Sequence, residues 1–266
     1  MIYSGNITKM ITEGISPVFY FLSVGTRQIL MNESIGRTIR IEFKNKINCI
    51  NCSAETKKSF HQGFCYSCFL TLPQTDEGTL RPERDMSHLG ISRDMEWSKK
   101  YSLIDHYVYL AITGNIKVGV TRYTQIPYRW VDQGAIKAIK LAKTPHRNLA
   151  GQIEVELSKH VPDKTNWSKM LKTTYTDIDL VKLKKDLCLL LPEDLRIYET
   201  FDDSITNISY PFNEDIEKYK SLNLDSSPLI EGKLAGIKGQ YLIFNNGNVI
   251  NIRKHNGYFI DFEIVE

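Results

Sequence analysis

Short runs that alternate between apolar and polar residues mark the start of the chain. Residues 18–22 form a β-rich apolar run that ends at Gly25, and residues 38–43 alternate with a period of two. Such alternation is typical of a strand with one buried face. We therefore expect short strands throughout the first segment.

A different order of elements is predicted in the middle of the chain. Residues 106–112 and 116–120 are apolar runs joined by a glycine-containing turn, which predicts a hairpin. We expect a helix after Pro127, because proline suits the first helical position, and a third strand over residues 135–142. The clearest helix would begin at Thr144-Pro145, with Thr144 as its N-cap.

Further apolar runs at residues 240–244, 248–252 and 258–262 predict strands near the end of the chain. Asn246-Gly247 and Asn256-Gly257 are strong hairpin signals between them. We expect a small antiparallel sheet or barrel here, one that could pack on the first segment.

Together these patterns predict an α+β protein, with a β-rich unit at residues 1–73, an irregular connection at 74–104, an α/β module at 105–185 and a β-rich domain at 186–266. The connection is polar and punctuated by Pro and Gly, with a short helix near residues 94–100. The 266 residues are 42% apolar, enough for a real core. No run of eighteen apolar residues occurs, so we expect no membrane span and no membrane partner.

The net charge of +3 hides an uneven distribution along the chain. Residues 1–116 carry +2, residues 117–185 carry +8 and residues 186–266 carry −7. A basic middle favours an anionic partner, most plausibly nucleic acid. The alternative is that these lysines only solvate helix faces.

Four cysteines form two C-x-x-C pairs, Cys49/Cys52 and Cys65/Cys68, separated by 12 residues. Two such turns can complete a tetrahedral shell around one metal ion, which predicts a structural Zn²⁺ site with no open position for catalysis. Two disulfides or four unrelated thiols are the alternatives. No signal peptide is evident near Met1, so we expect a cytoplasmic protein, in which disulfides are disfavoured.

Polar residues recur at suggestive points of the middle segment. Tyr107 and Tyr109 alternate with an apolar residue and so share one face of the first strand. Arg129 follows on the expected helix. Glu154 lies four residues after Ala150 and therefore borders the apolar stripe of the strong helix.

These residues resemble the GIY-YIG endonuclease superfamily over about residues 105–171. The resemblance rests on Val108-Tyr109, then Lys117-Val118-Gly119, then Arg129, Glu154 and Asn166. The whole chain, with its cysteine pairs before this module, is also similar to an uncharacterised bacterial family with no assigned function.

The resemblance implies roles for the matching residues. Tyr109, or its neighbour Tyr107, would be the general base, and Arg129 would hold the scissile phosphate. Glu154 would bind Mg²⁺ or Mn²⁺. Candidates for substrate binding are Lys117, Gly119 and Asn166, the last of which would fix the local structure or support a contacting residue.

Three positions depart from the superfamily pattern. Tyr107 stands where the first motif has glycine, Lys117 stands where the second has tyrosine, and Gln133 lies where a histidine often follows the arginine. The leading hypothesis is a nucleic-acid-binding protein with a possible metal-dependent endonuclease site. A non-catalytic DNA or RNA binder and a protein-interaction adaptor are the competing hypotheses.

Overall fold

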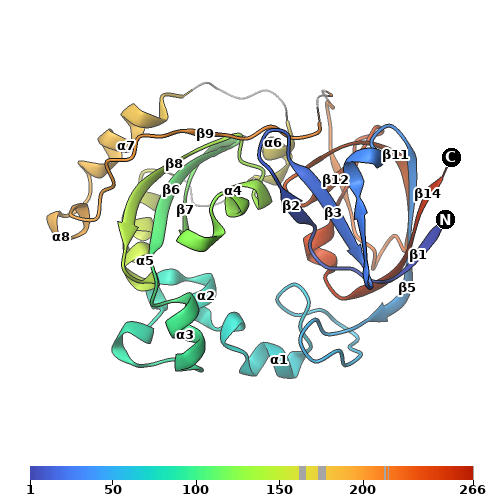
Figure 1. Ribbon diagram of the computed structural model, residues 1–266, viewed down its shortest axis with the longest axis horizontal. Coiled ribbons are helices and arrows are strands. Elements are labelled where there is room, and N and C mark those ends of the chain that lie inside the picture. Colours follow the sequence, from blue (N-terminus) through green and yellow to red (C-terminus); the bar gives the residue numbers. More distant parts are fainter. Residues whose placement is uncertain (162–165, 173–177, 213, 215, 266) are drawn as a thin grey trace. The chain divides into compact units, whose positions relative to one another are not determined.

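The computed structural model describes residues 1–161, 166–172, 178–212, 214 and 216–265. The chain forms two compact units (Figure 1). Unit 1 combines Met1–Leu70 with Ser209–Glu266, and unit 2 is Thr71–Ile208. The described helices include none that is long and apolar enough to cross a membrane.

Unit 1 is built on a large sheet that joins strands from both ends of the chain. Among the described residues its order is β1-β14-β5-β11-β12-β13-β10, and β10 runs parallel to β13 while the other pairs are antiparallel. The strands are β1 (Ile2–Asn6), β5 (Thr38–Ile47), β10 (Lys220–Leu222), β11 (Leu229–Lys238), β12 (Tyr241–Phe244), β13 (Asn248–Asn251) and β14 (Tyr258–Val265). A smaller sheet has β2 (Ile11–Glu13), β3 (Phe19–Val24) and β4 (Arg27–Leu30).

The alternating sequence of β5 matches the burial of its side chains in this sheet. Ile39, Ile41 and Phe43 are buried on one face, as the period of two requires. On β14, Ile260 and Phe262 are fully buried beside them. Unit 1 also contains the 3₁₀ helices Met31–Ser34 and Ile252–His255 and all but the last residue of α1 (Tyr66–Thr71).

The division into units differs from the predicted boundaries. β5 pairs with both β14 and β11, so the C-terminal strands share a sheet with the first segment rather than forming a domain over 186–266. The predicted hairpin at Asn256-Gly257 is also wrong, because β14 pairs with β1 and β5 and a 3₁₀ helix precedes it. Alternation identifies a strand but not its partner.

Unit 2 contains an antiparallel sheet with the order β7-β6-β8-β9. Its strands are β6 (His106–Thr113), β7 (Asn115–Arg122), β8 (Lys137–Thr144) and β9 (Thr206–Asn207). Its α-helices are α2 (Glu77–Leu80), α3 (Met95–Tyr101), α4 (Tyr128–Asp132), α5 (Arg147–Ser158), α6 (Trp167–Leu171), α7 (Leu180–Cys188) and α8 (Glu193–Arg196). Short 3₁₀ turns lie at Pro73–Thr75, Pro82–Arg84, Ser87–Leu89 and Tyr123–Gln125.

Helices cover both faces of this sheet near β6 and β7. The apolar stripe of α5, with Ile153 and Leu157 fully buried, packs in one core with Val108 and Leu110 of β6. On the other face Trp130 of α4 meets Tyr109 edge-on, with ring centroids 5.9 Å apart. Because β7 is the edge strand, side chains from both faces can reach one another around it.

The start of α5 differs from the prediction. Thr144 is the last residue of β8, and the N-cap is His146, whose Nδ1 accepts a hydrogen bond from the Leu149 N–H. Pro145 therefore lies before the helix instead of at its first position.

The predicted connection packs on α5 as a structured part of unit 2. Asn148 Nδ2 donates to the Glu83 carbonyl at 2.8 Å, and a Cβ on Gly151 would lie 2.1 Å from the Glu83 nitrogen. Arg147 donates to the Gly78 and Thr79 carbonyls at 2.8 and 2.7 Å. These contacts place Glu77–Arg84 against the first turns of α5.

Candidate metal site and basic pocket

Four cysteines of unit 1 converge on one point after β5. The Sγ atoms of Cys49, Cys52, Cys65 and Cys68 all lie within 4.8 Å of one another, and none forms a disulfide. Cys52 and Cys65 have their sulfurs 3.7 Å apart. A tetrahedral site with metal–sulfur bonds of about 2.3 Å separates its sulfurs by about 3.8 Å. The cluster therefore has the size that one metal ion requires.

Backbone N–H groups favour the thiolate form of Cys49. Burial raises the pKa of the Cys49 thiol, but hydrogen bonds from the backbone of Cys52, Cys65 and Asn51 outweigh it and lower this pKa to about 6. The Cys68 N–H likewise points at the Cys65 sulfur, 3.5 Å away. Burial and the neighbouring Cys65 and Cys52 side chains instead raise the pKa of the Cys68 thiol to about 12. Thiolates are the form that binds metals, so Cys49 is prepared for ligation, whereas Cys68 would release its proton when a metal binds.

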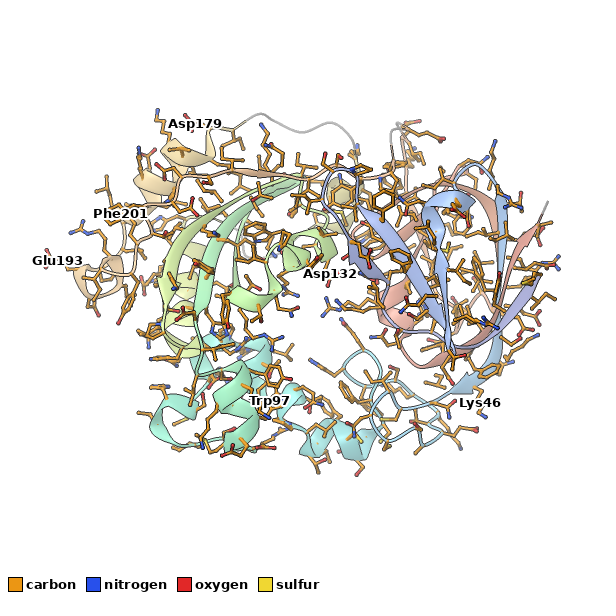
Figure 2. All side chains as sticks on the ribbon, in the orientation of Figure 1. Lys46, Trp97, Asp132, Asp179, Glu193 and Phe201 are labelled. Atoms are coloured by element: carbon orange, nitrogen blue, oxygen red, sulfur yellow. The ribbon has the colours of Figure 1, made fainter. Side chains whose placement is uncertain are left out.

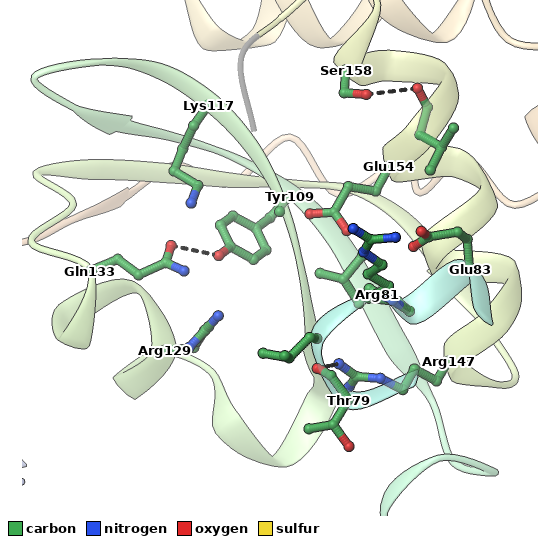
Figure 3. A pocket seen from close by; sticks show the side chains of 15 residues that line it. Thr79, Arg81, Glu83, Tyr109, Lys117, Arg129, Gln133, Arg147, Glu154 and Ser158 are labelled. Atoms are coloured by element: carbon green, nitrogen blue, oxygen red, sulfur yellow. Dashed lines mark hydrogen bonds between the residues drawn. The ribbon is translucent and has the colours of Figure 1, made fainter. Parts of the chain in front are cut away.

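A polar pocket of about 550 Å³ lies in unit 2 at the edge strand β7 (Figure 3). Tyr109, Gly119 and Gln133 line it. Its charged lining residues are Arg81, Glu83, Lys117, Arg129, Arg147 and Glu154. Five residues singled out from the sequence, from β6, β7, α4 and α5, therefore share one cavity: Tyr109, Lys117, Gly119, Arg129 and Glu154.

Tyr109 and Gly119 are directly opposite each other on paired strands. A Cβ at position 119 would lie 2.6 Å from the Tyr109 hydroxyl oxygen and 2.7 Å from Cζ. Any side chain on Gly119 would thus displace the tyrosine ring. The glycine allows the ring to lie flat on β7, with its hydroxyl at the pocket.

Gln133 links the tyrosine to an arginine. In the amide orientation that satisfies all donors and acceptors, Gln133 donates to the Tyr109 hydroxyl at 2.7 Å. Its oxygen then accepts from Nε and Nη2 of Arg129, both at 3.2 Å. The same oxygen lies 3.3 Å from the Tyr109 hydroxyl and can accept from it, so this bridge fixes the guanidinium beside the phenol.

The environment of Tyr109 sets its protonation state. Burial is the largest influence and raises the pKa of the phenol above its usual value, and the charge of Glu154 acts in the same direction. The charge of Arg129 and the hydrogen bonds from Arg129 and Gln133 oppose this shift without cancelling it. Tyr109 is therefore a neutral phenol at pH 7.

Three half-buried arginines gather around the pocket and repel one another. Burial lowers the pKa of Arg147 to about 10, and the charges of Arg122 and Arg129 contribute to that shift. Burial, together with the charge of Arg129, also lowers the pKa of Arg122. Within the described part of the chain neither Arg122 nor Arg129 has a carboxylate within ion-pair distance. An anion would relieve this repulsion.

Glu154 adds a carboxylate to this basic surface. It is half-buried on α5, one turn after Gly151, where the helix lies against Pro82 and Glu83. Glu83 lines the same pocket. Carboxylate oxygens are ligands that Mg²⁺ and Mn²⁺ accept, so the donor chemistry of the pocket fits one such ion.

Comparison with known proteins identifies the family of this chain. The model of a family described as "Protein of unknown function (DUF2797)" matches residues 36–260. The chain belongs to the DUF2797 family. The match takes in the four cysteines and every residue that lines the basic pocket. No curated protein and no solved structure matches the chain.

Other predicted residues of this DUF2797 chain lie away from the pocket lining. Tyr107 stands on β6 with the Lys140 ammonium 5.2 Å from its ring centroid. Asn166 caps α6, where its side chain accepts from the backbone N–H groups of Ser168 and Lys169 at 3.1 and 3.2 Å. Asn166 thus fixes local structure. The fifth cysteine, Cys188, lies in the apolar run 187–191 and is buried.

Arg81, Glu83 and Arg147 were not predicted from the sequence of this DUF2797 chain. Arg81 and Glu83 come from a stretch without periodicity, and only the fold brings it to α5. The position of Arg147 could have drawn attention to it. A cation in the first turn of a helix interacts unfavourably with the helix dipole, so its presence there suggests a role in binding or catalysis. The sequence singles out Gln133 only because it replaces a histidine of the superfamily pattern, and it does not predict the hydrogen bonds of its side chain.

Proposed function

We propose that unit 2 binds the sugar-phosphate backbone of nucleic acid in the basic pocket and hydrolyses a phosphodiester bond there. One observation carries the proposal: Tyr109, Lys117, Arg129 and Glu154, from separate elements, line one cavity. Their order along the chain resembles the GIY-YIG pattern, in which a tyrosine, an arginine and a glutamate perform this reaction. The charge of +8 over residues 117–185 supports a polyanionic partner.

Arg129 and Lys117 hold the phosphate in this proposal. The guanidinium of Arg129 is oriented through Gln133, at 3.2 Å, so it can present a fixed pair of donors to two phosphate oxygens. Lys117 contributes a point charge from the edge strand. Arg147, anchored on the Gly78 and Thr79 carbonyls, adds positive potential behind them.

Tyr109 removes the proton from the attacking water. The phenolate form accepts this proton, the water oxygen bonds to phosphorus, and the departing sugar oxygen leaves with the bonding pair and takes a proton from solvent. Gln133 keeps the phenol oxygen beside Arg129 during this step. Mg²⁺ or Mn²⁺ bound at Glu154 would supply positive charge that offsets the charge developing on the phosphoryl group.

Binding without cleavage is the second candidate function. It is favoured by Lys117, which cannot replace a phenol in a proton-transfer chain. Burial also raises the pKa of Tyr109, which reduces the phenolate available at neutral pH. The same pocket would then act as a phosphate clamp.

We also propose that Cys49, Cys52, Cys65 and Cys68 bind one structural Zn²⁺. The support is the 3.7 Å separation of the Cys52 and Cys65 sulfurs, which suits a tetrahedral ion with four thiolates. With all four positions filled by protein, this ion would stabilise the loop after β5 and leave the chemistry to unit 2.

Cleavage assays separate the two candidate functions. DNA and RNA oligonucleotides would be incubated with wild type and Glu154→Gln in Mg²⁺ or Mn²⁺. The hydrolysis proposal predicts cleavage by wild type and a loss of about 100-fold or more in the variant. Glu156→Gln is the matched control, because Glu156 lies on the same helix, outside the pocket lining, and pairs with Lys159.

Each outcome of this assay has one meaning. Equal cleavage by wild type and Glu154→Gln would contradict hydrolysis at this pocket, because it would indicate a contaminating nuclease. Binding by wild type without cleavage would establish the second candidate. No binding at low salt would reject both.

A further inference from the structure

A layered stack of side chains stands beside the basic pocket. Trp97 and Tyr101 on α3 have ring centroids 4.8 Å apart and planes tilted by 36° (Trp97 is labelled in Figure 2). The guanidinium carbon of Arg122 lies 4.7 Å from the centroid of the Tyr101 ring. The guanidinium therefore lies over the Tyr101 ring, within the range of cation–π attraction.

No ion pair among the described residues explains why Arg122 is held over the Tyr101 ring. No carboxylate among the described residues lies within ion-pair distance of it, and the side chain is half-buried. The charge of Arg129 acts on it unfavourably. A half-buried cation without a carboxylate partner costs free energy that an anionic or stacking ligand would offset.

The stack and the pocket are parts of one surface. The Arg147 N–H donates to the Ser102 carbonyl at 2.8 Å, which joins the end of α3 to the start of α5. Arg122 follows the pocket-lining Val120 on β7 with one residue between them, so their side chains are on the same face of the strand. A rise of about 3.3 Å per residue puts them about 7 Å apart along the strand. A nucleotide next to a phosphate held in the pocket can reach the stack.

We propose that Arg122, supported by Tyr101 and Trp97, is a stacking site for one unpaired base of the bound nucleic acid. The proposal rests on the function proposed above and adds the substrate class, which is a single strand or a locally unpaired segment. A base within a duplex has both faces covered by its neighbours, so it cannot stack on a protein side chain unless it is unstacked. Arginine planes and aromatic rings are the surfaces that receive such bases.

Fluorescence of 2-aminopurine tests this site, because the fluorescence is quenched when the base stacks. Single-stranded oligonucleotides with 2-aminopurine at successive positions, and matching duplexes, would be titrated with protein without added divalent metal. Arg122→Lys keeps the charge but removes the plane. Arg84→Lys is the matched control, since Arg84 pairs with Glu77 in the same unit and is outside the pocket lining.

The inference predicts quenching at one or two positions by wild type and by Arg84→Lys. Arg122→Lys should lose the quenching and bind the single strand roughly tenfold more weakly, since stacking of one base carries about that much affinity. Its affinity for duplex and its dependence on salt should not change. Thermal unfolding of the variant verifies that it is folded.

Two results would overturn the stacking site while leaving the proposed function intact. One is equal quenching by wild type and Arg122→Lys. The other is wild-type binding to a fully paired duplex as tight as to the single strand. Absence of binding to either form at low salt would reject the proposed function and this inference together.

Discussion

At the residue scale, Tyr109 is fully buried, yet it is part of the pocket wall. Gly119 makes this possible, because a Cβ there would lie 2.6 Å from the tyrosine oxygen. The order of tyrosine, glycine, arginine and glutamate was readable from the sequence. The bridge through Gln133 was not, because an amide 24 residues away reveals its partner only when the hydrogen bond is seen.

The protonation of Tyr109 gives a prediction for the pH dependence of cleavage. Burial raises the pKa of the phenol, so the fraction of phenolate should grow about tenfold per pH unit through neutral and mildly alkaline pH. The rate of DNA cleavage should therefore rise with pH from 6 to about 9 without a plateau. Tyr109→Phe should remove this rise. A plateau below about pH 8 in wild type would show that another group is the base.

At the scale of elements, α5 organises the site. It carries Arg147 and Glu154, packs its apolar stripe under the sheet, and receives the segment Glu77–Arg84 through Gly151. The apolar period and the approximate start of α5 were predictable. The sequence places the N-cap at Thr144, two residues before the observed N-cap, His146. Thr144-Pro145 matches the usual sequence of a helix start, but β8 extends to Thr144.

Asp85 anchors the segment before β6 and gives a second prediction. Its carboxylate accepts from the Ser102 hydroxyl at 2.6 Å and from the Ser87 N–H at 2.9 Å. Burial alone would raise the pKa of Asp85, but these hydrogen bonds outweigh it and lower the pKa. Its folded-state pKa is below the unfolded value, so its contribution to stability is present above about pH 4 and is lost as the pH falls further.

Asp85→Asn should therefore lower the free energy of unfolding at pH 7 by about 1–3 kcal/mol. The difference from wild type should shrink as the pH falls below about 4. Urea unfolding of both proteins at pH 7 and at acid pH measures this. A deficit that stays constant across this range would show that the charge of Asp85 is not what stabilises the segment.

At the scale of the whole molecule, the chain leaves unit 1, forms unit 2 and returns. The sequence predicted most strands but not this arrangement, because pairs such as β5 with β11 join residues nearly 190 positions apart, Ile41 and Ile230 for example. The loop with the four cysteines depends on the same return. Asn48 donates to the Gly257 carbonyl at 2.8 Å, and Asn256 donates to the Gln62 carbonyl at 2.9 Å.

This linkage predicts that metal removal destabilises unit 1. Purified protein should contain one zinc per chain, and a chelator should lower its Tm by several degrees, because bound metal stabilises only the folded state. Cys52→Ala should lose the zinc. Cys188→Ala is the matched control and should retain it, since Cys188 is buried in unit 2. Full zinc content in Cys52→Ala would contradict the four-cysteine site.

The salt dependence of nucleic-acid binding tests the central claim, that the basic pocket holds a phosphate, most directly. Affinity for a single-stranded oligonucleotide would be measured from low to physiological salt for wild type, Arg129→Gln and the control Arg84→Gln. The claim predicts that wild-type affinity falls steeply as the salt concentration rises and that Arg129→Gln binds more weakly. In a plot of log affinity against log salt concentration, the slope should become shallower by about one in Arg129→Gln and stay unchanged in Arg84→Gln, because one phosphate contact is lost. Identical affinity and slope in wild type and Arg129→Gln would contradict it.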